Sequence, residues 1–121
     1  MFKRILVPTD FSEASRAALE VARQSFPQAE IKLLHVIDED TPPCESCVRE
    51  QLEALGGGEF VYGNPAEQMM EMVKQWGADL IVMSVSGQSG LGGPYYTSVA
   101  EWMVRESPVP VMTVKTPPVR A

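Results

Sequence analysis

The chain has 121 residues, a hydrophobic content of 45% and a formal net charge of −6. The length fits a single domain, and the apolar content is that of a folded globular protein, which argues against intrinsic disorder. Nine of the sixteen acidic residues lie between residues 38 and 71 beside one basic residue, so we expect no nucleic-acid binding.

Strands and helices alternate from the amino terminus onward. Ile5-Leu6-Val7 is a short, continuous apolar run, which is typical of a strand buried on both faces. The side chains of Asp10-Phe11-Ser12 can cap a helix, and apolar residues at helical spacing then predict a helix that ends at Pro27. Residues 31–37 predict a second strand, in which we expect the only histidine, His35, to be a core residue with satisfied hydrogen bonds.

The middle of the chain begins with an acidic, proline-containing connector over residues 38–47. Apolar residues between 48 and 55 predict a short helix, and three glycines separate it from a brief strand over residues 60–62. Asn64-Pro65-Ala66-Glu67 has the pattern of a helix start, with a capping Asn, a Pro at the first helical position and a Glu three residues after the cap. The apolar face expected for this helix consists of Ala66, Met69, Met70, Val73 and Trp76.

The last third of the chain starts with another buried strand, predicted over residues 80–83. A long segment rich in glycine and serine follows over residues 84–96. Ser98 and Glu101 form a capping-box pattern that we expect to open the last helix. Its expected core contacts are Val99, Trp102 and Met103.

Residues 109–114 predict the last strand and residues 116–121 a tail, so we expect one domain over residues 1–115. Apolar strands that alternate with helices predict an α/β fold, in which helices cover both faces of a five-stranded parallel sheet. Ligands of such sheets bind beyond the carboxyl ends of the strands, where the strand order reverses. The segments after the first, second and fourth strands are therefore the candidate site.

A family resemblance rests on the order and spacing of several stretches, namely residues 5–12, 34–37, 63–66, 78–83, 98–101 and 107–111. Together these stretches resemble the universal stress protein family, over essentially the whole chain. The resemblance implies an open, Rossmann-like sheet in the order 3-2-1-4-5 and a stress-related binding or signalling role. It also implies a homodimer through the edge strand at residues 109–114, and an exposed apolar edge of this kind would otherwise invite aggregation.

One branch of that family binds ATP through a glycine-rich loop after the fourth strand, next to the amino-terminal end of the last helix. The loop positions correspond here to Ser84, Gly87, Thr97 and Ser98. Two of the three glycines are thus replaced, and the next position after Gly87, often basic in binding members, is Gln88. Because residues 84–98 hold no charged side chain, we expect weak binding of ATP, or binding of a less charged adenine ligand such as AMP. A chain that binds no nucleotide stays an open alternative.

The strand-end rule and the resemblance place the other nucleotide contacts around the same edge of the sheet. These residues are Pro8, Thr9, Asp10, Ile37, Met83 and Val99. Asp10 either holds a ribose hydroxyl or Mg²⁺, or only caps the first helix. Ile37 matches a position whose backbone faces adenine, so its side-chain type carries little information.

Cys44 and Cys47 form a C-x-x-C pair for which the resemblance gives no precedent. A thiol redox module and a metal site are the alternatives, although zinc needs about four ligands and the chain adds only His35 and carboxylates. Neighbouring acidic residues raise the pKa of a thiol, which favours an inert surface pair. No nucleophile–base pair is recognisable, so we expect a binding module rather than an enzyme.

Export and membrane insertion are not expected from this sequence. No apolar run approaches the roughly 20 residues of a membrane-spanning helix. The first apolar stretch is short, contains Pro8 and has no small-residue cleavage site after it, unlike a signal peptide. Two cysteines are also too few for a secreted disulfide framework, so we expect a cytoplasmic protein.

Overall fold

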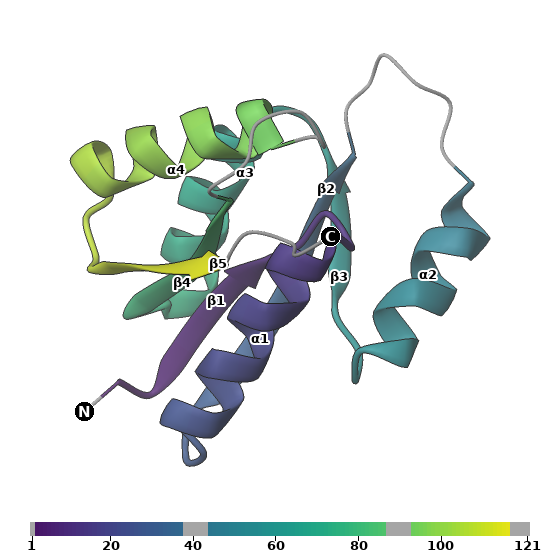
Figure 1. The fold of residues 1–121 in the computed structure, drawn as a ribbon, viewed down its shortest axis with the longest axis horizontal. Helices are drawn as coiled ribbons and strands as arrows, with labels where there is room; N and C mark the ends of the chain where they lie inside the picture. Colours follow the sequence, from purple (N-terminus) through teal and green to yellow (C-terminus); the bar gives the residue numbers. More distant parts are fainter. Residues whose placement is uncertain (1, 38–43, 87–92, 117–121) are drawn as a thin grey trace.

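Five parallel strands form one sheet in the order β3-β2-β1-β4-β5 in the computed structural model, which describes residues 2–37, 44–86 and 93–116 (Figure 1). The strands are β1 (Arg4–Pro8), β2 (Glu30–Ile37), β3 (Glu59–Tyr62), β4 (Leu80–Ser86) and β5 (Val111–Thr116). The helices are α1 (Glu13–Ser25), α2 (Glu45–Ala54), α3 (Pro65–Met72), its π-helical continuation η1 (Val73–Gly77) and α4 (Gly93–Glu106). The predicted fold class and strand order are thus confirmed.

The core consists of two apolar layers, one on each face of the sheet. Side chains alternate along a strand, so Leu6 points to one face while Ile5 and Val7 point to the other. Leu6 packs in one cluster with Met69 of α3 and Met103 of α4. Ile5 and Val7 belong to the second cluster, to which α1 and α2 contribute. Helices therefore cover both faces, as Figure 1 shows.

Two helix starts lie where their capping residues predict. The side chain of Asn64 accepts a hydrogen bond from the backbone N–H of Glu67 at 3.1 Å, directly before Pro65 opens α3. The hydroxyl oxygen of Ser12 accepts one from the backbone N–H of Ser15 at 3.2 Å and so caps α1. Such caps contribute about 1 kcal/mol each to helix stability.

The last helix begins earlier than expected. Because α4 starts at Gly93, Ser98 lies in its second turn, and the prediction that Ser98 opens the helix is wrong. Pro94 is the better start signal, since its ring holds φ near the helical value and it lacks the N–H that a first turn leaves unpaired.

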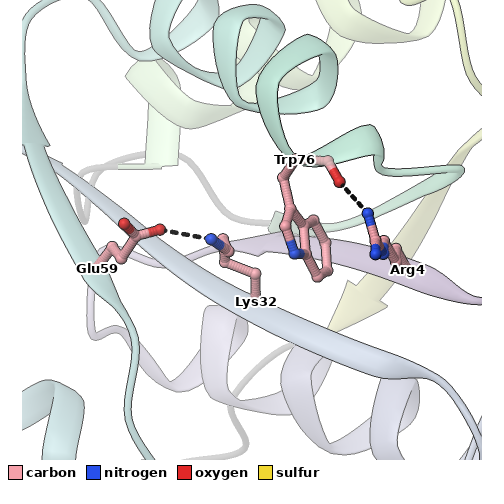
Figure 2. A network of polar contacts seen from close by, with 4 residues as sticks. All are labelled: Arg4, Lys32, Glu59 and Trp76. Carbon is pink, nitrogen blue, oxygen red and sulfur yellow. Dashed lines mark hydrogen bonds and ion pairs between the residues drawn. The ribbon is translucent and has the colours of Figure 1, made fainter.

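Trp76 lies between two basic side chains at the amino ends of the strands (Figure 2). The ring centroid is 5.1 Å from Lys32 Nζ and 5.9 Å from Arg4 Cζ. The Arg4 guanidinium also donates to the Trp76 carbonyl oxygen at 2.6 Å, and Lys32 forms an ion pair with Glu59 at 2.7 Å. These contacts join β1, β2, β3 and η1 at one edge of the sheet.

Asp79 lies at the same edge and makes the free energy of unfolding depend on pH. Desolvation acts to raise the pKa of its carboxyl, but the backbone N–H groups of Lys3 and Arg4, 2.9–3.2 Å from its oxygens, lower that pKa overall. A lowered pKa in the folded state stabilises the protein above the unfolded carboxyl pKa of about 4, and this contribution is lost as the pH falls through the folded value. We expect Asp79→Asn to be less stable than the parent at pH 7, with the difference shrinking below about pH 4 in urea unfolding. A difference that stays constant down to about pH 2.5 would contradict this assignment.

Candidate functional site

The two central strands stop pairing before they end. The register between β1 and β4 runs only over Ile5↔Leu80 and Leu6↔Ile81, whereas β1 continues to Pro8 and β4 to Ser86. The strand order also reverses here, since β2 lies on the other side of β1. The carboxyl ends of these strands therefore form the topological switch point at which such sheets bind ligands.

Thr9 follows β1, and its side chain makes hydrogen bonds within the protein. The residue is only 1% exposed, and its hydroxyl oxygen accepts the backbone N–H of Phe11 at 3.0 Å. The same hydroxyl lies 2.9 Å from the Ser15 oxygen. Because the Ser15 hydroxyl donates to the Ser12 carbonyl at 3.0 Å, Thr9 is the donor to Ser15. Its backbone N–H also donates to the Leu34 carbonyl oxygen at 2.8 Å. Thr9 thus positions the turn after β1, and neither its side chain nor its N–H is left for a ligand.

His35 supports this turn from β2. Its Nδ1 lies 2.8 Å from the Thr9 carbonyl oxygen, and because a carbonyl can only accept, Nδ1 carries the proton. The predicted hydrogen bonding is confirmed for Nδ1, but His35 is half-buried and lies outside both core clusters, so its assignment to the core is wrong. Its ring stacks on Phe11 with centroids 4.5 Å apart. Phe11 has a φ of +66°, a strained conformation for a bulky side chain, of a kind that clusters at binding sites.

Asp10 stands at the tip of this turn and is half-buried. One carboxylate oxygen, Oδ1, accepts the backbone N–H of Ser12 at 2.9 Å and so holds the turn before the helix. The N-cap of α1 is Ser12 itself, so the alternative that Asp10 caps this helix is wrong. No further hydrogen bond to the Asp10 carboxylate is found within residues 2–37, 44–86 and 93–116. Its other oxygen, Oδ2, therefore has no hydrogen-bond partner among these residues.

The remaining strand-end residues lie along the same edge. Ile37 ends β2, is 7% exposed and accepts the backbone N–H of Gly63 through its carbonyl at 3.0 Å. The Met83 side chain is buried in the core, so this residue could meet a ligand only through its backbone. Ser84 belongs to β4 and pairs with Val114 of β5, which extends the strand beyond its predicted end. The carboxyl edge therefore brings together Pro8, Thr9, Asp10, Ile37 and Ser84.

The predicted phosphate loop is only partly described. Gly87 and Gln88 lie outside the described residues, whereas Thr97, Ser98 and Val99 belong to the body of α4. Val99 is buried, as expected. Amides without an intrahelical partner occur in the first turn of a helix, which here begins at Gly93. Ser98 therefore cannot offer the free helix amides that the resemblance implies, and Pro94 has no N–H to add.

The two cysteines are joined to one another. Cys44 is the N-cap of α2, and a disulfide links it to Cys47, so the expectation of an unbonded thiol pair is wrong. Both residues are exposed. In the part of the chain that the structure describes, no group of three or more potential metal-ligating side chains is found. With both sulfurs bonded, the pair offers no thiolate to a metal.

None of the helices described is both long enough and apolar enough to span a bilayer.

Comparison with known proteins identifies the fold and its relatives. The model of the universal stress protein family matches residues 1–56 and 58–115. The chain belongs to this family. Universal stress protein MJ0531 of Methanocaldococcus jannaschii is 28% identical over an alignment of 145 positions, gaps included, which covers 97% of this chain and 84% of the relative.

Two solved structures have the same fold as this chain, and one of them contains a bound nucleotide. The structure of protein MJ0577 has a TM-score of 0.71 at 29% identity and covers 98% of this chain and 99% of its own. A universal stress protein solved in complex with cAMP has a TM-score of 0.70 and covers 96% and 99%. At 22% identity, that second likeness is evidence for the fold alone.

The residues that the sequence interpretation missed are those that shape the turn. Phe11, Ser15 and His35 hold Thr9 and Asp10 in place, yet no local pattern marks them as site residues. His35 contacts Thr9 across 26 positions of the chain, and only the pairing of β1 with β2 brings them together.

Proposed function

We propose that this universal stress protein is a cytoplasmic, non-enzymatic module that binds an adenine nucleotide at the carboxyl ends of β1, β2 and β4. The observation that carries the proposal is the turn at Thr9–Phe11, strained at Phe11 and held by two hydrogen bonds and a stacked ring. This turn places Asp10 at the switch point with one oxygen left for a ribose hydroxyl.

The charge of the site favours a ligand with few phosphates. Residues 84–98 contain no charged side chain, and α4 begins with Gly93-Pro94, which reduces the number of amides available to an anion. A triphosphate would need Mg²⁺, for which Asp10 offers one carboxylate. AMP and cAMP carry fewer charges, and a relative of the same fold was solved with cAMP. We therefore expect AMP or cAMP to bind more tightly than ATP.

Calorimetric titration of nucleotide-stripped protein tests this proposal, with AMP, cAMP and ATP, each with and without Mg²⁺. Asp10→Asn keeps an oxygen that can accept the Ser12 N–H but loses the charge, and we expect it to weaken binding about tenfold, in line with a lost charged hydrogen bond. Glu13→Gln is the matched control, since it removes the same charge from an exposed residue of α1 and should change affinity less than about twofold. Equal affinities for the parent and Asp10→Asn would restrict Asp10 to holding the turn before α1, and no heat with any nucleotide would overturn the proposal.

We also propose a homodimer that forms through β5 and α4. β5 is an edge strand of the sheet, and beside it a groove of about 350 Å³ is lined by Val85, Val104 and Thr113, among others. Trp102, expected in the core, is 37% exposed, and Val104 is 56% exposed. Exposed apolar side chains next to an edge strand are stabilised when a second copy covers them.

Light scattering after size exclusion tests the dimer. Thr113 is exposed on β5, and we expect Thr113→Lys to convert a dimer into a monomer at micromolar concentration, because a lysine on an edge strand opposes strand pairing. Gln51→Lys adds the same charge to an exposed position of α2 and should leave the dimer intact. A parent protein that is monomeric under these conditions would contradict the proposal.

A further inference from the structure

The disulfide lies at the exposed start of a helix. Cys44 is the N-cap of the ten-residue helix α2, and Cys47 lies in its first turn. Both residues are exposed, so a reductant can approach either sulfur. In a cytoplasmic protein, as proposed above, a disulfide is rare and is usually redox-active.

The bond contributes little to holding α2 in place. It closes a loop of only four residues, and short loops gain least from a crosslink. α2 is already attached through the buried side chains Val48 and Leu52. The Tyr62 hydroxyl also donates to Glu45 at the start of the helix, and Arg23 donates to the Leu55 carbonyl at its end. Breaking the disulfide should therefore leave the fold intact.

The environment of Cys44 stabilises a thiolate. Its sulfur accepts the backbone N–H of Cys47 at 3.3 Å and lies 3.5 Å from the Ser46 hydroxyl. The amino-terminal end of a helix lowers the pKa of a cysteine placed there. Glu45 acts in the opposite direction through its charge, although its carboxylate is engaged by the Tyr62 hydroxyl. The same donors remain when the disulfide opens, because they belong to the helix backbone and to Ser46.

We propose that Cys44–Cys47 is a reversible redox site that exchanges with dithiol reductants and releases Cys44 as the thiolate. A thiolate of the reductant attacks the Cys47 sulfur, forms a mixed disulfide and displaces Cys44 with the bonding electron pair. The second thiolate of the reductant then attacks its own sulfur in the mixed disulfide and releases Cys47. The protein gains two electrons, the reductant becomes a disulfide, and its two thiol protons pass to the cysteine sulfurs or to water.

The first experiment reduces the folded protein with dithiothreitol at pH 7 and traps the thiols with iodoacetamide for mass spectrometry. We expect both cysteines to be labelled while the circular dichroism spectrum stays that of the oxidised protein. In a second sample without iodoacetamide, we expect the bond to reform when the dithiol is removed in air. Reduction that occurs only when the protein unfolds, or that itself unfolds it, would show a structural crosslink and overturn the proposal. Neither result depends on nucleotide binding, so the two proposals fail separately.

The second experiment compares single thiols on the same helix. Cys47→Ser leaves Cys44 as the single thiol, and Cys44→Ser leaves Cys47. A third variant replaces both cysteines by serine and adds Gln51→Cys, which supplies an ordinary exposed thiol on the same helix. We expect Cys44 to react with iodoacetamide at pH 7 at least tenfold faster than either of the other thiols. Ser46→Ala should lower the rate at Cys44 without changing its order relative to the others. Equal rates at all three positions would contradict the proposal that Cys44 is released as the thiolate.

Discussion

Replacing Leu6 by alanine should lower the free energy of unfolding by about 3–4 kcal/mol, because it deletes a side chain at the centre of the sheet and leaves a cavity. Leu6 is fully buried and contacts the layer formed by α3 and α4. It also belongs to one of the two pairs that join β1 to β4. A domain of this size is stable by only about 5–15 kcal/mol, so the loss is a large part of the total.

Urea unfolding followed by circular dichroism measures this loss. Leu6→Met is the matched control, because it keeps the volume and the apolar character and should cost less than about 1.5 kcal/mol. If Leu6→Ala and Leu6→Met were equally stable, the packing assigned to this layer would be wrong.

Thr9→Val should lower the free energy of unfolding by about 2 kcal/mol and weaken nucleotide binding as well. Valine has nearly the shape of threonine, but it cannot accept from the Phe11 N–H or donate to the Ser15 oxygen. The Phe11 N–H would then lose this partner, and the buried Ser15 oxygen would keep only its hydrogen bonds with Ser12. A polar group left without its partner in a buried place costs more than a hydrogen bond that water could replace. The strained Phe11 would also lose the contact that fixes its backbone.

Thr9→Ser separates this effect from packing. Serine retains the hydroxyl and loses only a methyl group, so we expect it to cost about 1 kcal/mol and to bind nucleotide like the parent. Thermal unfolding and the titration described above give the two readouts. A Thr9→Val variant that is as stable as Thr9→Ser would show that the hydroxyl does not hold the turn.

Local patterns predict the framework of this protein well. The continuous apolar runs at residues 5–7 and 80–83 lie in β1 and β4. Strands that are buried on both faces consist of apolar residues throughout, so such runs are recognisable in the sequence. Asn64 and Pro65 mark the start of α3 through backbone chemistry that is local to that turn. The strand order came from the resemblance, since apolar periodicity alone does not order the strands.

The start of α4 and the disulfide were missed for a shared reason. In both cases the first turn of a helix carries no apolar stripe, so the helix was expected to begin where its buried face begins. For α2 the expected start was near Val48, which hid the position of Cys44 as N-cap. For α4 it was Ser98, five residues after the observed start at Gly93.

The turn at Thr9 and Asp10 shows another limit of the sequence. Its position was predicted, because it follows the central strand. Its geometry was not, because it depends on Ser15 in the first turn of α1 and on His35 in β2. Contacts of this kind appear only when β1 and β2 are placed side by side.

The short pairing between β1 and β4 divides the sheet into two halves, β3-β2-β1 and β4-β5, that meet along a narrow seam. α1 lies across this seam and contacts both central strands. Ala18 and Ala22, both fully buried, present small side chains there, so the helix can lie close to the two halves at once. α1 thus packs against both halves of the sheet, and it begins directly after the turn that carries Asp10. A ligand bound at that turn would therefore lie at the start of a helix that contacts both central strands.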